Sequence, residues 1–112
     1  MKHSQFIALQ NQTNEYNYIF VEGEYQDIYY NVDQNLEIEL DSFLLTIEVE
    51  AKADISLSEY TYSYPEDAEI DHESFEIKKL EIAVYCDDVE QQLTSKQEFW
   101  LYDAIEKYIE IQ

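Results

Sequence analysis

Few side chains in this sequence could act as nucleophiles, acid–base catalysts or soft metal ligands. There is one cysteine, Cys86, and there are two histidines, His3 near the first residue and His72 within an acidic stretch. Cys86 lies in phase with Ile82 and Val84, and free cysteine is most often a small buried hydrophobic residue. A single glycine excludes a glycine-rich phosphate loop, a nucleophile elbow and a dinucleotide fingerprint. The sequence therefore argues against an enzyme.

Oxygen ligands for a hard metal ion are more plentiful. Two acidic clusters occupy consecutive predicted connections: Glu69, Asp71, His72 and Glu73, and then Asp87, Asp88 and Glu90. Carboxylates of this kind bind calcium, but neither cluster has the alternating ligands and central glycine of an EF-hand loop. We expect solvated loops without a metal or cofactor, and calcium binding stays as an alternative.

The charge balance is the strongest functional signal. The 112 residues include 26 acids against six lysines and no arginine, for a formal net charge of −20. Ten acids and no lysine stand between Lys2 and Lys52. Hydrophobic residues at 46% and aromatic residues at 15% indicate a folded chain rather than an acidic tail. Such a surface repels itself and disfavours nucleic acid and anionic membranes, whereas it attracts a basic protein.

The chain is expected to be one domain, residues 1–112, because its length suits a single core. One cysteine cannot form an intramolecular disulfide, so an oxidising compartment is not implied. The apolar run near the first residue is too short for a secretion signal, and no segment approaches the ~20 apolar residues of a membrane span. These features predict a cytoplasmic protein.

The elements that would position the acids are mostly strands. Every odd position from Phe43 to Leu57 is apolar, which predicts a strand with one buried face. The apolar phase then slips to the even positions Tyr60, Tyr62 and Tyr64, which suggests a bulge, a bend or a tight turn near residues 56–59.

The segments around this strand predict its partners. Segments 16–22 and 24–32 flank Gly23 and predict a hairpin. Residues 33–35 predict a second turn that leads into a strand over 36–41. Segment 75–86 alternates with a slip at Lys78 and Lys79, which predicts a bulge. Residues 1–13 are weakly patterned, and within them Phe6 to Leu9 fit either a short edge strand or a helical turn.

The last segment predicts a helix. Ser95 followed by Glu98 matches a capping box. Apolar residues then recur at helical spacing and should face the sheet, and they are Leu101, Tyr102, Ile105, Tyr108 and Ile109. The fold class is therefore α+β, with five or six mostly antiparallel strands and a C-terminal helix packed on one face.

Rows of acids along the predicted strands suggest a binding surface. Carboxylates two residues apart project from one strand face at roughly 6.6 to 6.8 Å intervals, the same order as successive phosphates of a nucleic-acid strand. The strand acids we select are Glu22, Glu24, Glu37, Glu39, Asp41, Glu48 and Glu50. A second candidate surface is the acidic loop with Glu66, Asp67, Glu69, Asp71 and Glu73. These rows predict a nucleic-acid mimic that occupies the basic groove of a nucleic-acid-binding protein.

Part of the chain has a recognisable order of elements. Tyr60, Tyr62 and Tyr64 precede Pro65, and an acidic loop with Asp71, a strand over 76–84, a connection over 87–93 and a helix over 101–109 follow. This order resembles a loose class of small uncharacterised phage and prophage proteins. The resemblance implies a phage setting and carries no activity, and it invites comparison with anti-CRISPR and anti-restriction DNA mimics that inhibit host defence proteins.

Two other interpretations stay open. The acidity could be a general adaptation to solubility or high salt, without a specific partner. Alternatively, the eleven tyrosines could form a homo-oligomer through the sheet, although tyrosine also suits a half-buried strand surface and can meet a partner's arginine. The oligomeric state is not predicted.

Overall fold

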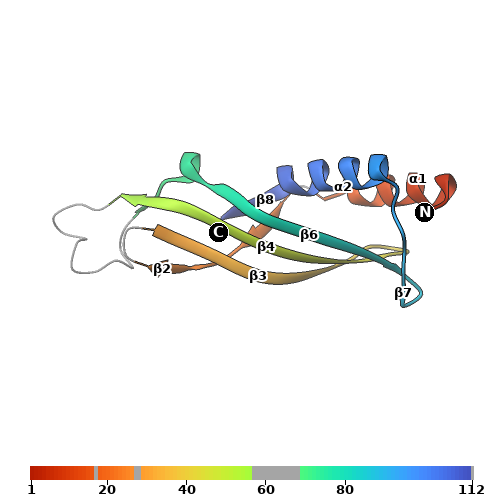
Figure 1. The fold of residues 1–112 in the computed structure, drawn as a ribbon, viewed down its shortest axis with the longest axis horizontal. Coiled ribbons are helices and arrows are strands. Elements are labelled where there is room, and N and C mark those ends of the chain that lie inside the picture. Colours follow the sequence, from red (N-terminus) through yellow and green to blue (C-terminus); the bar gives the residue numbers. More distant parts are fainter. Residues whose placement is uncertain (17, 27–28, 57–68, 112) are drawn as a thin grey trace.

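The long alternating segment forms the central strand of the molecule. In this computed structural model, which describes residues 1–16, 18–26, 29–56 and 69–111, β4 (Leu44–Ser56) lies between β3 (Tyr29–Glu39) and β6 (Glu76–Cys86). Both neighbours run antiparallel to β4, and the three strands form a long curved layer (Figure 1). The odd positions of β4 from Leu45 to Ala53 are buried as the alternation predicts, and Ile55 is partly buried.

Shorter strands complete the sheet. β2 (Glu24–Gln26) pairs with β3, and β7 (Val89–Glu90) pairs with the end of β6. β5 (Glu69–Ile70) pairs with the end of β4 and leads into the short 3-10 helix η2 (His72–Ser74). The described residues therefore form a six-stranded antiparallel sheet in the order β2-β3-β4-β6-β7, with β5 beside the end of β4.

One face of this sheet is covered by helices. α1 (His3–Thr13) and α2 (Ser95–Tyr108) both lie on that side, together with a two-stranded parallel ribbon of β1 (Ile19–Val21) and β8 (Ile109–Ile111) (Figure 1). The largest fully buried side chains come from both layers: Leu9, Thr13, Val21, Leu45, Ile47, Val49, Val84, Leu101 and Ile105. The α+β fold with a C-terminal helix on one face is confirmed.

Specific contacts fix the helices on the sheet. The Tyr102 hydroxyl accepts a hydrogen bond from the backbone N–H of Ile82 at 3.0 Å. α2 therefore supplies a hydrogen-bond acceptor to the outer edge of β6. Phe6 of α1 meets Trp100 of α2 edge to face, with ring centroids 5.7 Å apart. Gln12 of α1 accepts the backbone N–H of Ser42 at 2.9 Å, which ties α1 to the turn between β3 and β4.

The bulge predicted at Lys78 and Lys79 is confirmed. The register between β4 and β6 shifts between Glu50 and Ala51, where Glu50 pairs with Lys79 and Ala51 pairs with Ile77. Lys78 is therefore the extra residue of β6.

The hairpin predicted at Gly23 is wrong. β1 leaves the main sheet and pairs with β8, while β2 forms its hairpin with β3 instead. Gly23 is needed for space rather than for a turn, because an added Cβ would lie 2.0 Å from the backbone oxygen of Asn31. A short apolar strand such as β1 can pair with any exposed edge of matching register. Its partner β8 lies about 90 residues away in the sequence, so the local sequence could not identify that partner.

The turn predicted at residues 33–35 is also wrong. β3 runs through these positions without a break, because Asp33 and Asn35 project from its solvent face and the Gln34 side chain accepts the backbone N–H of Glu22. The strand predicted over 36–41 corresponds to the second half of β3, which ends at Glu39. The reversal comes later, where the N–H of Leu40 bonds the carbonyl of Phe43.

The boundaries of the two helices correct the sequence prediction. α2 is capped by Thr94, whose hydroxyl accepts the N–H of Gln97 while the Gln97 side chain accepts the N–H of Thr94, and Ser95 is its first helical residue. The helix ends at Tyr108, so Ile109 is buried in β8 rather than on the helical stripe. Residues 1–13, for which the sequence did not decide between strand and helix, contain α1.

The predicted change of direction near residues 56–59 and the tyrosines at 60, 62 and 64 lie largely outside the described residues.

Candidate partner-binding surface

The sheet face opposite the helices is built from alternate residues of the long strands. The register places Asp33 opposite Glu50, Asn35 opposite Glu48, and Glu48 opposite Glu81. Because the other alternate residues of β3, β4 and β6 point into the core, these side chains project away from both helices. We call this surface the open face, and the acids that β2, β3, β4 and β6 contribute to it are Glu24, Asp33, Glu37, Glu39, Glu48, Glu50, Asp54, Glu76 and Glu81.

Two of the three lysines on the open face lie in one part of it. Lys52 lies over the ring of Tyr29, with Nζ 3.5 Å from the ring centroid. Lys78 forms an ion pair with Glu76 at 2.8 Å, and this ammonium group lowers the pKa of the Glu76 carboxyl from its ordinary value. Both contacts lie towards the end of the sheet that carries η2, since β4 meets η2 at that end.

The opposite part of the open face consists of Glu37, Glu39, Glu48 and Glu81, and we call it the acidic end. It lies towards the turns that join β3 to β4 and β6 to β7. An open trough of about 720 Å³ lies over it, and its lining includes Glu37, Glu48, Glu81 and, from β7, Glu90. Side chains from four strands therefore place carboxylates around one hollow.

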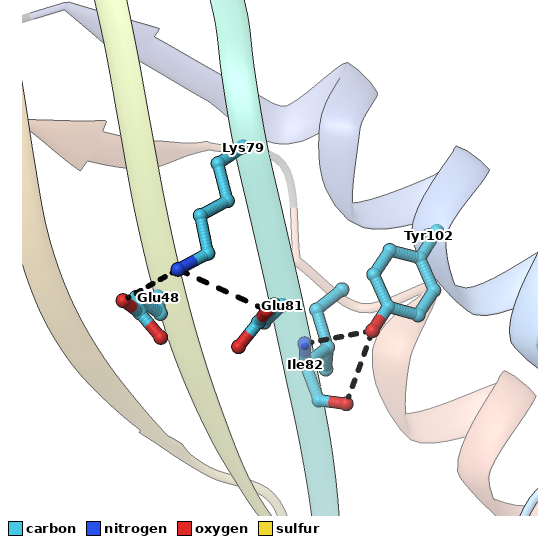
Figure 2. Close-up of polar contacts among 5 residues, drawn as sticks. All are labelled: Glu48, Lys79, Glu81, Ile82 and Tyr102. Atoms are coloured by element: carbon cyan, nitrogen blue, oxygen red, sulfur yellow. Dashed lines mark hydrogen bonds and ion pairs between the residues drawn. The ribbon is translucent and has the colours of Figure 1, made fainter.

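Lys79 reaches into the acidic end from its border. Its Nζ lies 3.3 Å from Oε1 of Glu48 and 3.8 Å from Oε1 of Glu81, as Figure 2 shows. Tyr102 lies on the other side of β6, where its hydroxyl bonds the backbone of Ile82 (Figure 2). The hydrogen bond and charge of Glu48 raise the pKa of the Lys79 ammonium group, because they favour its protonated form.

Like charges face each other directly at two places. Asp33 pairs with Glu50 across β3 and β4, and Glu48 pairs with Glu81 across β4 and β6. Directly opposite residues in an antiparallel pair have Cβ atoms about 4.5–5.5 Å apart, so like charges there destabilise the sheet. These acid pairs do not by themselves stabilise the sheet. Lys79 lies near Glu48 and Glu81 and relieves part of the repulsion between them.

The structure brings together five of the acids selected from sequence: Glu24, Glu37, Glu39, Glu48 and Glu50. Glu22 follows the end of β1 and Asp41 lies in the turn after β3, and both are exposed. Glu69 of β5 pairs with Ser56 and so projects on the same side of the sheet, at the end opposite the turn between β3 and β4. Asp71 and Glu73 lie at η2, where Asp71 accepts the N–H of Glu73. Glu66 and Asp67 lie outside the described residues.

Sequence reasoning missed four acids of the open face: Asp33, Asp54, Glu76 and Glu81. Asp33 was assigned to a turn that does not exist. Glu81 could have been found, because the buried alternation of Leu80, Ile82 and Val84 requires it to project to the opposite face. Asp54 likewise follows from the alternation of β4.

The described residues bear on the other candidate sites too. No group of three or more histidine, cysteine or acidic side chains gathers there as metal ligands would, and no helix among them is long and apolar enough to cross a membrane. Cys86 is partly buried and packs against the core. No family model, curated protein or solved structure matches this chain.

Proposed function

We propose that this protein binds the basic nucleic-acid-binding surface of another protein and excludes nucleic acid from it. The observation that carries the proposal is the open face, where β2, β3, β4 and β6 project nine carboxylates from one side of a sheet whose other side holds the core. Such a surface gains affinity for lysine and arginine from the same electrostatic term that binds DNA.

The arrangement of charge favours this proposal over a general adaptation to solubility. Acids spread for solubility would avoid direct like-charge neighbours, yet Asp33 and Glu50 stand opposite each other, as do Glu48 and Glu81. Neighbouring strands are about 4.8 Å apart and alternate residues about 6.8 Å apart, so the carboxylates form a two-dimensional grid. A grid of this kind suits a groove that binds a polyphosphate.

The setting we propose is that of a phage protein acting in the host cytoplasm, with a host defence protein as the partner. The net charge of −20 disfavours direct contact with nucleic acid and with anionic membranes. The protein would act by stoichiometric binding, without an enzymatic step or a cofactor.

Capture of partners from a bacterial lysate tests this proposal. The immobilised protein is expected to retain a basic DNA-binding protein at low salt and to release it at high salt, because such contacts are screened. The released protein should bind DNA when it is free and lose DNA binding when this chain is added back. Retention that does not change with salt, or a captured protein that still binds DNA, would contradict the proposal.

A charge-matched pair of variants controls this experiment. Glu37→Lys, Glu39→Lys and Glu48→Lys together reverse three carboxylates of the open face. Glu98→Lys, Glu106→Lys and Glu110→Lys together change the net charge equally, but on exposed positions of α2 and β8. The first variant should lose the partner and the second should retain it, with circular dichroism confirming that both are folded.

Self-association is a second candidate function. The rings of Tyr18 and Phe20 stack at a centroid distance of 5.8 Å, and the two residues are 59% and 52% exposed. They could therefore pack against a second copy of the chain. A sedimentation velocity run at micromolar concentration tests this candidate, because a dimer that dissociates in the Phe20→Ser variant would support it and a monomer would exclude it.

A further inference from the structure

Within the acidic end, repulsion between carboxylates is strongest where Glu48 and Glu81 lie directly opposite each other. Glu48 and Glu81 are direct cross-strand neighbours, and their side chains are 40% and 62% exposed. Both can therefore be reached from solvent on the open face. Two negative charges at this separation repel each other, and a cation between them would remove the repulsion.

Lys79 supplies that cation in the free protein, but its contacts are loose. The distances of 3.3 and 3.8 Å to Glu48 and Glu81 exceed the 2.7–2.9 Å of a good charge-assisted hydrogen bond. The backbone register places Lys79 directly opposite Glu50, so its side chain leans along the sheet to reach the other two acids. The Lys79 side chain is also 42% exposed, so a partner can reach it from solvent.

An arginine side chain fits the two carboxylates better than a lysine does. The ammonium group is a compact point charge, whereas the guanidinium group is a planar fork with five N–H donors. One guanidinium can donate to Glu48 and Glu81 at the same time. Glu50 lies directly opposite Lys79 across the two strands. A displaced Lys79 could pair with Glu50, so its ammonium group would still have a carboxylate nearby.

We propose that Lys79 stands in for an arginine of the partner, and that on binding this arginine displaces Lys79 and bridges Glu48 and Glu81. The inference rests on the proposed function, since it names the partner side chain that the open face selects. It predicts that the surface prefers arginine-rich partners to lysine-rich ones of equal charge. The chain contains no arginine of its own, so no internal guanidinium competes for this place.

Fluorescence anisotropy with labelled octa-arginine and octa-lysine peptides tests the proposal. The wild type should bind octa-arginine more tightly. Lys79→Met should raise octa-arginine affinity about three- to fivefold, because one competing charge is removed. The matched control is Lys78→Met, which makes the same change of charge one residue away, beside Glu76, and should have a smaller effect. Glu48→Gln with Glu81→Gln should abolish the preference for arginine.

The outcomes separate this inference from the proposed function. Equal affinity for the two peptides, or equal effects of Lys79→Met and Lys78→Met, would overturn the role of Lys79 while binding to the open face stands. Octa-arginine binding that the Glu37, Glu39 and Glu48 reversal leaves unchanged would overturn both.

An NMR measurement distinguishes displacement of Lys79 from a general effect of the peptide's charge. With lysine side chains labelled with carbon-13, octa-arginine should shift the Cε signal of Lys79 strongly. It should leave the signal of Lys107 unchanged, because that side chain pairs with Asp103 on α2. Equal shifts of both signals would contradict displacement at Lys79.

Discussion

The two faces of β4 differ in what holds their residues in place. Ile47 is 1% exposed and packs between the sheet and the helices, whereas its neighbour Glu48 points to the open face opposite Glu81. Packing explains the apolar residues of the first face. The fold does not explain the acids of the second, because like charges directly opposite each other raise the energy of the sheet. We therefore propose that the open face serves a partner rather than the fold.

The largest expected effect is a difference in the free energy of unfolding between substitutions on the two faces of β4. Ile47→Ala should lower the free energy of unfolding by about 2–5 kcal/mol, because it leaves a cavity in the core. Glu48→Gln, one residue away, should change it far less. Urea denaturation measures both, and a comparable loss at the two positions would break the contrast between the faces.

A smaller effect is expected where a helix meets the edge of the sheet. Tyr102→Phe removes the hydroxyl that accepts the Ile82 N–H, and should lower the free energy of unfolding by about 0.5–1.5 kcal/mol. Hydrogen exchange of the Ile82 amide should quicken, while the Val49 amide of the central strand serves as a reference. An unchanged Ile82 exchange rate would show that α2 does not protect this edge.

Removing a charge from the open face should stabilise the protein. Asp33→Asn relieves repulsion with Glu50 and should raise the free energy of unfolding by about 0.2–1 kcal/mol at low salt. The gain should shrink at high salt, which screens the same repulsion. Asp41→Asn in the exposed turn is the matched control, and an equal gain there would mean that net charge, and not the cross-strand pair, is responsible.

The smallest effect concerns the pH response of the Glu76 and Lys78 pair. Because Lys78 lowers the pKa of the Glu76 carboxyl, this pair stabilises the fold above the ordinary glutamate pKa and loses that contribution as pH falls through the lowered value. Both groups are exposed, so the change in stability is small. Carbon-13 titration should show the pKa of Glu76 rising in Lys78→Met, and an unchanged value would contradict the pairing.

Periodicity predicted much of the fold. The alternation from Phe43 onward located β4 and its buried face, and the slip at Lys78 located the bulge. These features are local, since a strand with one buried face must alternate. The C-terminal helix was found for a similar reason, although its cap is Thr94 rather than Ser95.

The errors arose where distant contacts decide the structure. Asp33 and Asn35 have turn-forming side chains, but pairing of β3 with β4 along its whole length keeps this segment extended. β1 pairs with β8, a contact that no local pattern predicts. The candidate site followed this division only in part. Five acids in phase with a strand were found, and the false turn hid Asp33. Asp54, Glu76 and Glu81 were missed although they lie in phase with predicted strands.

The central claim is that the open face excludes nucleic acid from a basic protein. The most direct test is a titration of the DNA complex of the captured protein with this chain, monitored by anisotropy of labelled DNA. The account predicts full release of DNA at an equimolar ratio, and no release by the Glu37, Glu39 and Glu48 reversal. DNA that stays bound while this chain also binds would contradict it.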